Sequence, residues 1–302
     1  MTTSLPPLPA GLTTRPVTRE DSRSLFELIA AQELEDTGRV DIEEADLIAD
    51  WNRPSHDLTA RSIAVLAGDR IVGYGELVGV DRADAAVHPE FRGRGIGTWI
   101  AGWIRDTARR LGSTVVGMPV FVGSAGDRLL TGLGYRVRWH SWVLRLPAGA
   151  AVPARELPAG YAIHEARPDE LHAVHDVLED AFLEWSVRER ESFEDFTAST
   201  LGRPGFEPWN LRVVTDSVGD VVGVAVVILA DDTAYVDRLA THADHRNRGI
   251  AQALLVDAFA MGRAHGATIS ELSTDSRTGA LGLYEKVGMV VTSNYVNRAI
   301  HL

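Results

Sequence analysis

The chain has 302 residues, 45% of them hydrophobic, which is enough for two domains of roughly 150 residues with a core each. Its formal net charge of -12 at pH 7 argues against a general nucleic-acid binder, because contacts to phosphate groups need a positive field. The sequence contains no cysteine, which excludes disulfides, thiolate metal sites and a cysteine nucleophile and favours a cytoplasmic location.

The start of the chain predicts neither a signal peptide nor a membrane anchor. The opening MTTSLPPLPAG has no basic region followed by an apolar core. The longest apolar run, VVGVAVVILA from residue 221, is too short to span a bilayer as a helix, and its valine content is typical of a buried strand. We therefore expect no membrane partner.

The same landmarks occur twice along the chain, in the same order. The tetrapeptide LPAG at 8–11 returns at 157–160, with a further copy at 146–149, and the copies at 8–11 and 157–160 each precede a predicted strand, turn and helix with an acidic start. The later landmarks are GDRIVG and GDVVG, which end at Gly73 and Gly223, the Arg-x-Arg-Gly motifs that begin at Arg92 and Arg246, and the glycines Gly134 and Gly288. A repeat at so constant an offset indicates two copies of one domain.

We expect an N-terminal domain at residues 11–148, a linker at 149–157 and a C-terminal domain at 158–302. The linker prediction rests on the segment LPAGAAVPARELPAG, whose three prolines and small residues suit an exposed connection.

Hydrophobic periodicity predicts the same order of strands and helices in both copies. In the second copy we expect helices near residues 168–184, 192–202, 249–265 and 278–287, and strands near 161–165, 210–216, 221–230, 234–241, 269–274 and 290–301. The predicted fold class is α/β (α+β), with two tandem domains that each have a mixed central β-sheet flanked by helices.

Each copy places an Arg-x-Arg-Gly motif between a strand and a helix, as FRGRGIGTWIAGWI from residue 91 and HRNRGIAQALLVDA from residue 245. A helix start has unpaired N–H groups and the positive end of the helix dipole, which suits an anion. Glycines let a phosphate approach the backbone, so the motif predicts a pyrophosphate site. In the alternative interpretation, the glycines only make the turn and the arginines only face solvent.

The pattern Arg-x-x-Gly-x-Gly/Ala, placed after a strand and at the opening of a helix, resembles the acetyl-CoA motif of the GNAT superfamily of N-acetyltransferases. VHPEFRGRGIGTWI carries the resemblance in the first copy and THADHRNRGIAQALL in the second. The segment TDSRTGALGLYEKVGM is similar to a late strand-to-helix segment of the family, with Arg277 where the family usually has asparagine. Together the matches cover nearly the whole chain as two tandem GNAT domains.

The resemblance implies that acetyl-CoA is the acyl donor, that no metal takes part, and that the strand ends and loops hold the carrier. The implied residues of the second copy are Leu239, Ala240, Thr241, Arg246, Asn247, Arg248, Gly249, Ile250, Ala251 and Gln252. Those of the first copy are Ala86, Val87, His88, Arg92, Gly93, Arg94, Gly95, Ile96, Gly97 and Thr98.

In this family a tyrosine of the late helix often protonates the leaving thiolate, and the matching residue here is Tyr284. Leu130 stands at that position in the first copy, so we expect the C-terminal domain to catalyse and the N-terminal domain to be catalytically degenerate. Without the resemblance, Tyr284 would be interpreted as a helix tyrosine that packs on the sheet.

Asp237 is the candidate general base, because family bases commonly project from the strand that leads to the loop. Alternation along a strand places it on the same face as Tyr235. An ion pair with Arg238 is an equally good interpretation of Asp237, and Glu271 on the next strand is another candidate base. The matched histidines His88 and His242 fit a shared structural role at the strand end.

The combined prediction is an N-acetyltransferase that transfers an acetyl group from acetyl-CoA to a primary amine of a small molecule, by direct attack in a ternary complex. Two alternatives stay open: a non-catalytic acyl-CoA-binding sensor or interaction module, and an N-acyltransferase for a longer acyl chain. The acidic excess of residues 179–195 fits either attraction of a cationic amine or a solvated helix face. We expect no nucleic-acid partner, and either a monomer or a dimer.

Overall fold

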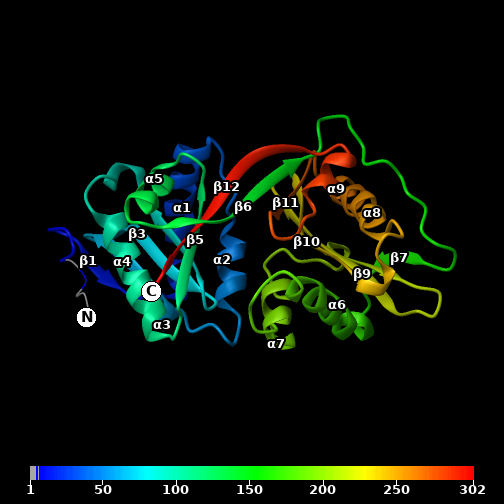
Figure 1. The fold of residues 1–302 in the computed structure, drawn as a ribbon, viewed down its shortest axis with the longest axis horizontal. Helices are drawn as coiled ribbons and strands as arrows, with labels where there is room; N and C mark the ends of the chain where they lie inside the picture. The colour runs from blue at the N-terminus through cyan, green and yellow to red at the C-terminus, as the bar shows by residue number, and fades with distance from the viewer. Residues whose placement is uncertain (1–4, 6) are drawn as a thin grey trace. The chain divides into compact units, whose positions relative to one another are not determined.

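The computed structural model describes residue 5 and residues 7–302 of the chain (Figure 1). Residues 1–4 and 6, which belong to the opening segment for which no signal peptide is expected, lie outside the described residues. The chain forms two compact units. Unit 1 comprises the chain up to His140 together with Tyr295–Leu302, and unit 2 comprises Ser141–Asn294.

Unit 1 is built on a mixed sheet with the strand order β1-β2-β3-β4-β5-β12. The strands are β1 (Thr13–Arg15), β2 (Ser62–Ala67), β3 (Arg70–Val78), β4 (Arg82–Val87), β5 (Val115–Phe121) and the last part of β12 (Val290–His301). The helices are α1 (Ser22–Thr37), α2 (Glu44–Trp51), α3 (Leu58–Arg61), α4 (Ile96–Arg110) and α5 (Ala125–Gly132).

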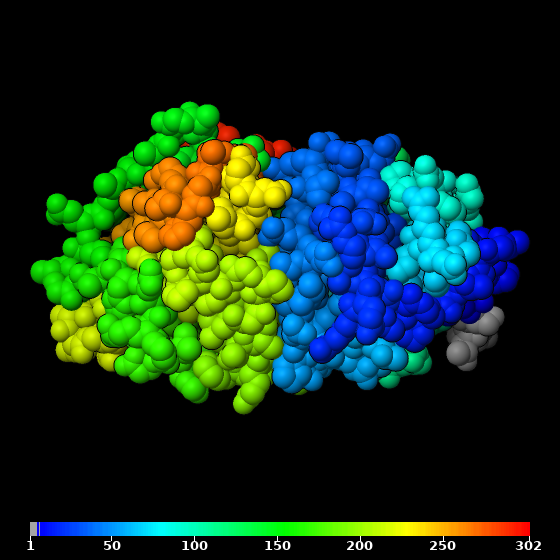
Figure 2. All heavy atoms as spheres, turned by 180° about the vertical axis from the view of Figure 1, so that it is seen from behind, coloured from blue at the N-terminus to red at the C-terminus, as the bar shows by residue number. Residues whose placement is uncertain are grey.

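Two apolar clusters place helices on both faces of the unit 1 sheet. Ile96, Ile100 and Ile104 recur every four residues along α4 and pack on Val72 of β3. On the opposite face, α1 and α2 pack on the neighbouring side chains of β3, among them Tyr74. Figure 2, seen from behind, shows in blue the surface that α1 and α2 present on this unit.

Unit 2 repeats this plan with the strand order β6-β11-β10-β9-β8-β7. Its strands are the last part of β6 (Arg136–Arg145), β7 (Ala162–Glu165), β8 (Leu211–Thr215), β9 (Val221–Ala230), β10 (Thr233–Thr241) and β11 (Ile269–Asp275). Its helices are α6 (Leu171–Leu183), α7 (Phe193–Phe196), α8 (Ile250–Ala264) and α9 (Leu281–Lys286).

The predicted α/β fold class and the predicted elements of the second copy are confirmed, with one difference in detail. The helix expected at 192–202 is a single turn, α7, which continues as a π-helical turn over Thr197–Leu201. Its buried Phe196 packs beneath α6 on the valines of β9, so tertiary contacts rather than length hold this segment helical.

In both units the two parallel central strands separate after a short pairing. In unit 1, the pairing of β4 with β5 is confined to Arg82 and Gly117 among the described residues. In unit 2, β10 pairs with β11 over Thr233–Val236, and beyond that point it pairs only with β9. The separated strand ends leave backbone N–H and C=O groups that a ligand can bind as an added strand would.

Each unit is completed by a strand from a distant part of the sequence. Tyr295–His301 of β12 pair antiparallel with β5 in unit 1. Ser141–Arg145 of β6 pair antiparallel with β11 in unit 2. Since both segments add an antiparallel strand beside the parallel pair, each unit has the same sheet although their chain segments are not contiguous.

Helix α8 approaches β10 closely because Gly262 has no side chain. A Cβ at this position would overlap the Cβ of Ala234, which lies in the apolar core of unit 2. We expect Gly262→Ala to destabilise unit 2 by about 1–3 kcal/mol through overpacking. Denaturant unfolding measures this change.

The control is Gly282→Ala on α9, where a Cβ would meet no atom within 4 Å. This variant is expected to be neutral or more stable by up to about 1 kcal/mol, because alanine favours helix over glycine. Equal stabilities of the two variants would show that α8 does not contact β10 this closely.

Within the described part of the chain, no helix combines the length and apolar character needed to cross a membrane.

Candidate active site

The Arg-x-Arg-Gly loops adopt the same backbone conformation in both units. Gly93 and Gly95 of unit 1 have φ values of 75° and 86°, and Asn247 and Gly249 of unit 2 have 62° and 85°. Asparagine is one of the few side chains that tolerate the left-handed region, so Asn247 can replace a glycine here. Gly95 and Gly249 are the N-caps of α4 and α8, so each loop presents the free N–H groups of a 15-residue helix.

The first arginine of each motif is held by a carboxylate at the end of the preceding long helix. Arg92 donates to both oxygens of Asp36 on α1, at 2.8 Å each. Arg246 donates to both oxygens of Glu184, at 2.7 Å each, and this ion pair lowers the pKa of Glu184. The first arginines therefore anchor the loops, and their charge is already paired.

The second arginine and the histidine of each motif also have matching contacts. The Nη2 atom of Arg94 donates at 3.2 Å to the carbonyl oxygen of Glu90, and that of Arg248 donates at 3.2 Å to the carbonyl oxygen of Asp244.

The Nδ1 atoms of His88 and His242 each accept a hydrogen bond from the backbone N–H two residues further along the chain, at 3.3 Å. The histidines cap a short 3-10 turn in both units, which is the shared structural role expected at the strand end.

The glycine at the second helical position in unit 1 serves packing. A Cβ on Gly97 would lie 2.8 Å from Leu129 of α5. In unit 2 this position is Ala251, followed by Gln252, whose side-chain amide donates to the carbonyl oxygen of Pro153 at 2.6 Å.

The segment before β7 lies against the unit 2 loop. A Cβ on Gly249 would lie 2.5 Å from Nε of Arg155. The hydroxyl of Tyr161 lies 2.9 Å from both His245 Nδ1 and Arg248 Nη1. Residues 153–161, which the sequence predicts as linker and first strand, thus bring a third guanidinium to the start of α8.

The end of β10 leads into this loop. Ala240 is buried under α6, and the alternation of the strand puts Leu239 and Thr241 on the face toward α8. The Oγ1 atom of Thr241 is buried and has no hydrogen-bond partner among the residues that the structure describes. A buried hydroxyl without a partner is costly, so this atom is suited to bind a ligand at the strand end.

Tyr284 lies on α9 and is largely buried in the main apolar core of unit 2. Burial raises the pKa of its phenol to about 12, so the hydroxyl keeps its proton at neutral pH. Leu130 at the matching place in unit 1 is buried in the core, and Thr131 beside it donates to the carbonyl of Asp127 within its own helix, at 2.7 Å.

Asp237 sits at a β-bulge. Val236 and Arg238 are opposite consecutive residues of β9, which leaves Asp237 as the extra residue. The bulge changes the expected alternation: Arg238, rather than Asp237, takes the register position on the face of Tyr235. Asp237 is exposed, and its carboxylate lies 3.6 Å from Arg238 Nε, so the ion pair considered as the alternative is present.

The other polar groups named near Asp237 also have partners. The hydroxyl of Tyr235 donates to Ser273 at 2.7 Å. Glu271 is buried and pairs with Arg145 of β6, at 2.7 Å.

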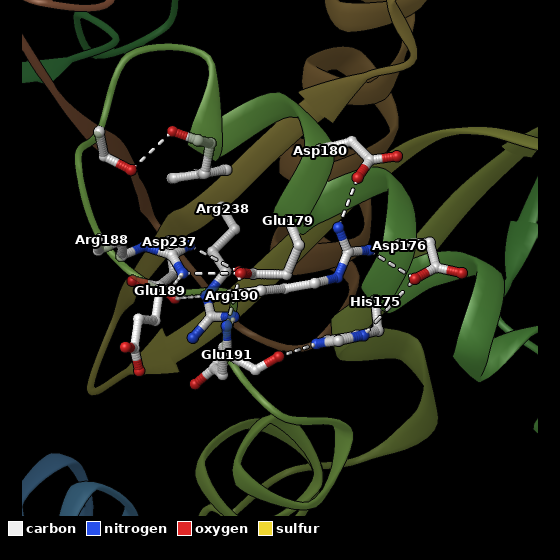
Figure 3. A network of polar contacts seen from close by, with 12 residues as sticks. His175, Asp176, Glu179, Asp180, Arg188, Glu189, Arg190, Glu191, Asp237 and Arg238 are labelled. Carbon is white, nitrogen blue, oxygen red and sulfur yellow. Dashed lines mark hydrogen bonds and ion pairs between the residues drawn. The ribbon is translucent and has the colours of Figure 1, made fainter.

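Two arginines of the segment after α6 pair with carboxylates on α6 itself, as Figure 3 shows. Arg188 donates to both oxygens of Glu179, at 2.7 and 2.6 Å, and Arg190 bridges Asp176 and Asp180 at 2.6 Å each. This network folds the segment back on α6 and ties it to β10, because Arg238 donates to the Glu191 carboxylate at 3.2 Å. The carboxylates of Asp176, Glu179, Asp180 and Glu191 are therefore already paired with arginines.

Unit 1 contains a cavity of about 770 Å³. Its wall includes eight of the ten residues predicted to hold the carrier in the first copy: Ala86, Val87, Arg92, Gly93, Gly95, Ile96, Gly97 and Thr98. Its other walls come from α1, α2, β3, β5, α5 and Tyr295 of β12. The loop and a sizeable cavity therefore adjoin in the unit that was expected to be degenerate.

Two α/β units, each with separated parallel strands and a glycine-arginine loop at a helix N-terminus, define a transferase of the kind that uses acyl-CoA. The chain belongs to the acetyltransferase (GNAT) family, which it matches over residues 23–126 and 171–289. The two matched segments confirm the resemblance seen in the sequence, and the chain is accordingly an N-acetyltransferase.

The relatives share both units. The chain is 29% identical over 279 residues to the mycothiol acetyltransferase of Salinispora arenicola (strain CNS-205), with 83% of each chain covered. It is similar to the solved structure of a GCN5-related N-acetyltransferase from Sphaerobacter thermophilus, with a TM-score of 0.76, 26% identity and 98% and 97% of the two chains covered. A tandem GNAT protein from the clavulanic acid biosynthesis pathway shares the fold, with a TM-score of 0.71, 19% identity and 96% and 98% covered.

Sequence reasoning missed three groups near the sites. Arg155 was assigned to the linker, and nothing in its neighbourhood in the sequence marks it. Tyr295 was seen only as part of a terminal strand. Glu76 had a signal, since it is a carboxylate in the apolar strand RIVGYGELV where the second copy has Val226.

Proposed function

We propose that the protein transfers an acetyl group from acetyl-CoA to a primary amine of a small molecule, and that unit 2 carries out the transfer. The observation that carries this proposal is the combination, in unit 2, of the loop at the start of α8 with a protonated tyrosine on α9.

The pyrophosphate of the carrier would bind to the backbone N–H groups at the start of α8. Gly249 has no side chain there, and the Arg155 side chain, which packs directly against it, adds positive charge. The pantetheine arm would run along the separated end of β10, where the Thr241 hydroxyl has no partner within the described part of the chain. These features suit a long carrier with a charged head and an amide-bearing arm.

Transfer needs three events. The neutral amine nitrogen attacks the thioester carbonyl carbon, loses one proton as the amide bond forms, and the carbon–sulfur bond breaks. The departing thiolate then takes a proton, which the Tyr284 phenol supplies in this proposal. Asp237 is the proposed acceptor of the amine proton, acting directly or through one water. Its carboxylate is exposed at the bulge of β10, the strand that leads into the loop.

A thiol assay on the full-length chain tests the proposal. Acetyl-CoA is incubated with a panel of small primary amines, and released CoA is measured. We expect release that saturates with at least one amine. Tight binding of acetyl-CoA with no release for any amine would instead favour an acyl-CoA sensor, and release only from longer acyl-CoA thioesters would favour a different acyl donor.

A further inference from the structure

We propose that the unit 1 cavity is a second ligand site, separate from the Tyr284 site of unit 2, and that it binds a small organic cation with its ammonium group against Glu76 and Asp84. The argument rests on the charge of the cavity wall, on the hydrogen bonds at its floor and on a comparison of the two units.

The cavity wall carries an excess of negative charge. Six carboxylates line it against two guanidinium groups, those of Arg82 and Arg92. The carboxylates are Glu33, Asp36, Asp46, Asp50, Glu76 and Asp84. Arg92 is fully engaged by Asp36, and Arg82, which is more than half exposed, lies 3.8 Å from Asp84. The remaining carboxylates therefore face the cavity with little cationic compensation from its wall.

Some of these carboxylates have structural partners outside the cavity. Glu33 accepts the backbone N–H groups of Asp41 and Ile42, at 2.7 and 2.9 Å, and Asp50 pairs with Arg53. Asp46 accepts the N–H of Glu43 at 3.1 Å as part of a helix cap. Glu76 and Asp84 lie on the sheet itself, at the floor of the cavity.

Glu76 is a buried carboxylate held in a fixed position. It is 2% exposed, and its Oε2 atom accepts hydrogen bonds from the Trp51 indole, at 3.1 Å, and from the Tyr74 hydroxyl. His56 Nε2 lies 3.0 Å from the other oxygen. Burial and the Glu76 carboxylate raise the pKa of the Tyr74 phenol well above its usual value, so this hydroxyl remains a donor.

Asp84 stands directly opposite Glu76 in the antiparallel pairing of β3 with β4. Like charges in directly opposite positions destabilise a sheet, and both side chains point to the same face. Burial, together with the Glu76 charge, raises the pKa of Asp84 although Arg82 opposes the shift. A cation between the two carboxylates would remove this repulsion.

Unit 2 shows that the fold does not require this arrangement. The glycines Gly73 and Gly223 occupy matching positions, so Tyr74 and Glu76 correspond to Val224 and Val226. Both valines belong to an apolar core cluster with Phe196, and the residue opposite Val226 is Arg238. A buried carboxylate is seldom more stabilising than an apolar side chain of similar volume, so the polar floor of unit 1 points to ligand binding.

The rest of the cavity suits the apolar part of such a cation. Apolar side chains from the central strands β4 and β5 and from α1 line it. They include Ile29 of α1 and Met118 and Phe121 of β5. Tyr295 stands against Phe121, with ring centroids 5.6 Å apart, and adds a hydroxyl to the wall. A cavity of this volume accommodates a small molecule with both an ammonium group and a hydrocarbon part.

Isothermal titration calorimetry on the full-length chain, without acetyl-CoA, tests the proposal with hexylammonium as the probe and hexan-1-ol as its neutral counterpart. We expect hexylammonium to saturate one site and hexan-1-ol to bind at least about tenfold more weakly, because only the cation compensates the negative charge of Glu76 and Asp84. No saturable binding of hexylammonium, or equal binding of the alcohol, would overturn the proposal.

Three variants locate the site. Glu76→Gln and Asp84→Asn should each weaken hexylammonium binding at least tenfold, while Glu90→Gln, an exposed carboxylate outside the cavity wall, should change it less than twofold. Asp84→Asn keeps the test valid if Glu76→Gln does not fold. Unchanged affinity in Asp84→Asn would exclude the site, and because no acetyl-CoA is present the result is independent of the transfer proposed for unit 2.

Discussion

Replacing Tyr284 by phenylalanine is expected to lower kcat by about 100-fold or more while the KM for acetyl-CoA changes little, because general-acid catalysis contributes factors of this size. The substitution keeps the aromatic ring, so the packing of α9 in the core of unit 2 is retained. With a pKa of about 12, the phenol of Tyr284 stays protonated in the wild-type protein. Wild-type kcat should therefore not fall through loss of this proton below about pH 11.

The matched control is Tyr135→Phe in unit 1, which also removes a buried tyrosine hydroxyl. The Tyr135 hydroxyl has no hydrogen-bond partner within the described residues, so its loss should leave both kcat and stability nearly unchanged. Steady-state kinetics on the two variants give the comparison. If Tyr284→Phe retains full turnover, Tyr284 does not donate the proton and its role is only to pack on the sheet.

Gly249→Val is expected to raise the KM for acetyl-CoA at least about tenfold, since the new side chain covers backbone N–H groups that would bind the pyrophosphate. The residue has a φ of 85°, and its Cβ would meet the Arg155 side chain. A β-branched residue in the left-handed region is strained, so a loss of stability of about 1–3 kcal/mol is expected as well.

Gly266→Val separates the effect on binding from the effect on the backbone. Gly266 has a φ of 102° just after the other end of α8, where a Cβ would meet no atom within 4 Å. We expect a similar loss of stability in this variant and no change in the KM for acetyl-CoA. A similar rise in KM in both variants would mean that helix stability, and not access to the loop, controls carrier binding.

The repeat and the loops could be predicted from sequence because local residues specify them. Glycines and prolines punctuate the elements, and the left-handed glycines at the helix starts are visible as an Arg-x-Arg-Gly pattern in both copies. The helical spacing of Ile96, Ile100, Trp103, Ala108 and Leu111 likewise predicts α4, although Leu111 caps its end and is 45% exposed. These signals lie within a few residues of the structure they determine.

The features that sequence did not predict depend on contacts between distant residues. A bulge at Asp237 changes which side chains of β10 share a face, and simple alternation cannot show where a bulge falls. Tyr295 enters the unit 1 cavity through strand pairing with β5, far from its neighbours in sequence. The domain boundaries at 11–148 and 158–302 stay a prediction from the linker composition.

The interpretation of the acidic segment after α6 changes for the same reason. Its sequence composition fits either attraction of a cation or a solvated helix face, and in the structure Arg188 and Arg190 fold it back by pairing with Glu179 and Asp180 of α6 (Figure 3). Unit 1 also gathers carboxylates, which line one cavity from α1, α2, β3 and β4.

A crystal structure of the protein with bound acetyl-CoA tests the central claim most directly. The account predicts a pyrophosphate on the backbone of residues 247–251 and a thioester sulfur within hydrogen-bonding reach of the Tyr284 hydroxyl, at no more than about 4 Å. A carrier bound to unit 1 alone, or a Tyr284 hydroxyl separated from the sulfur by the core of unit 2, would contradict it.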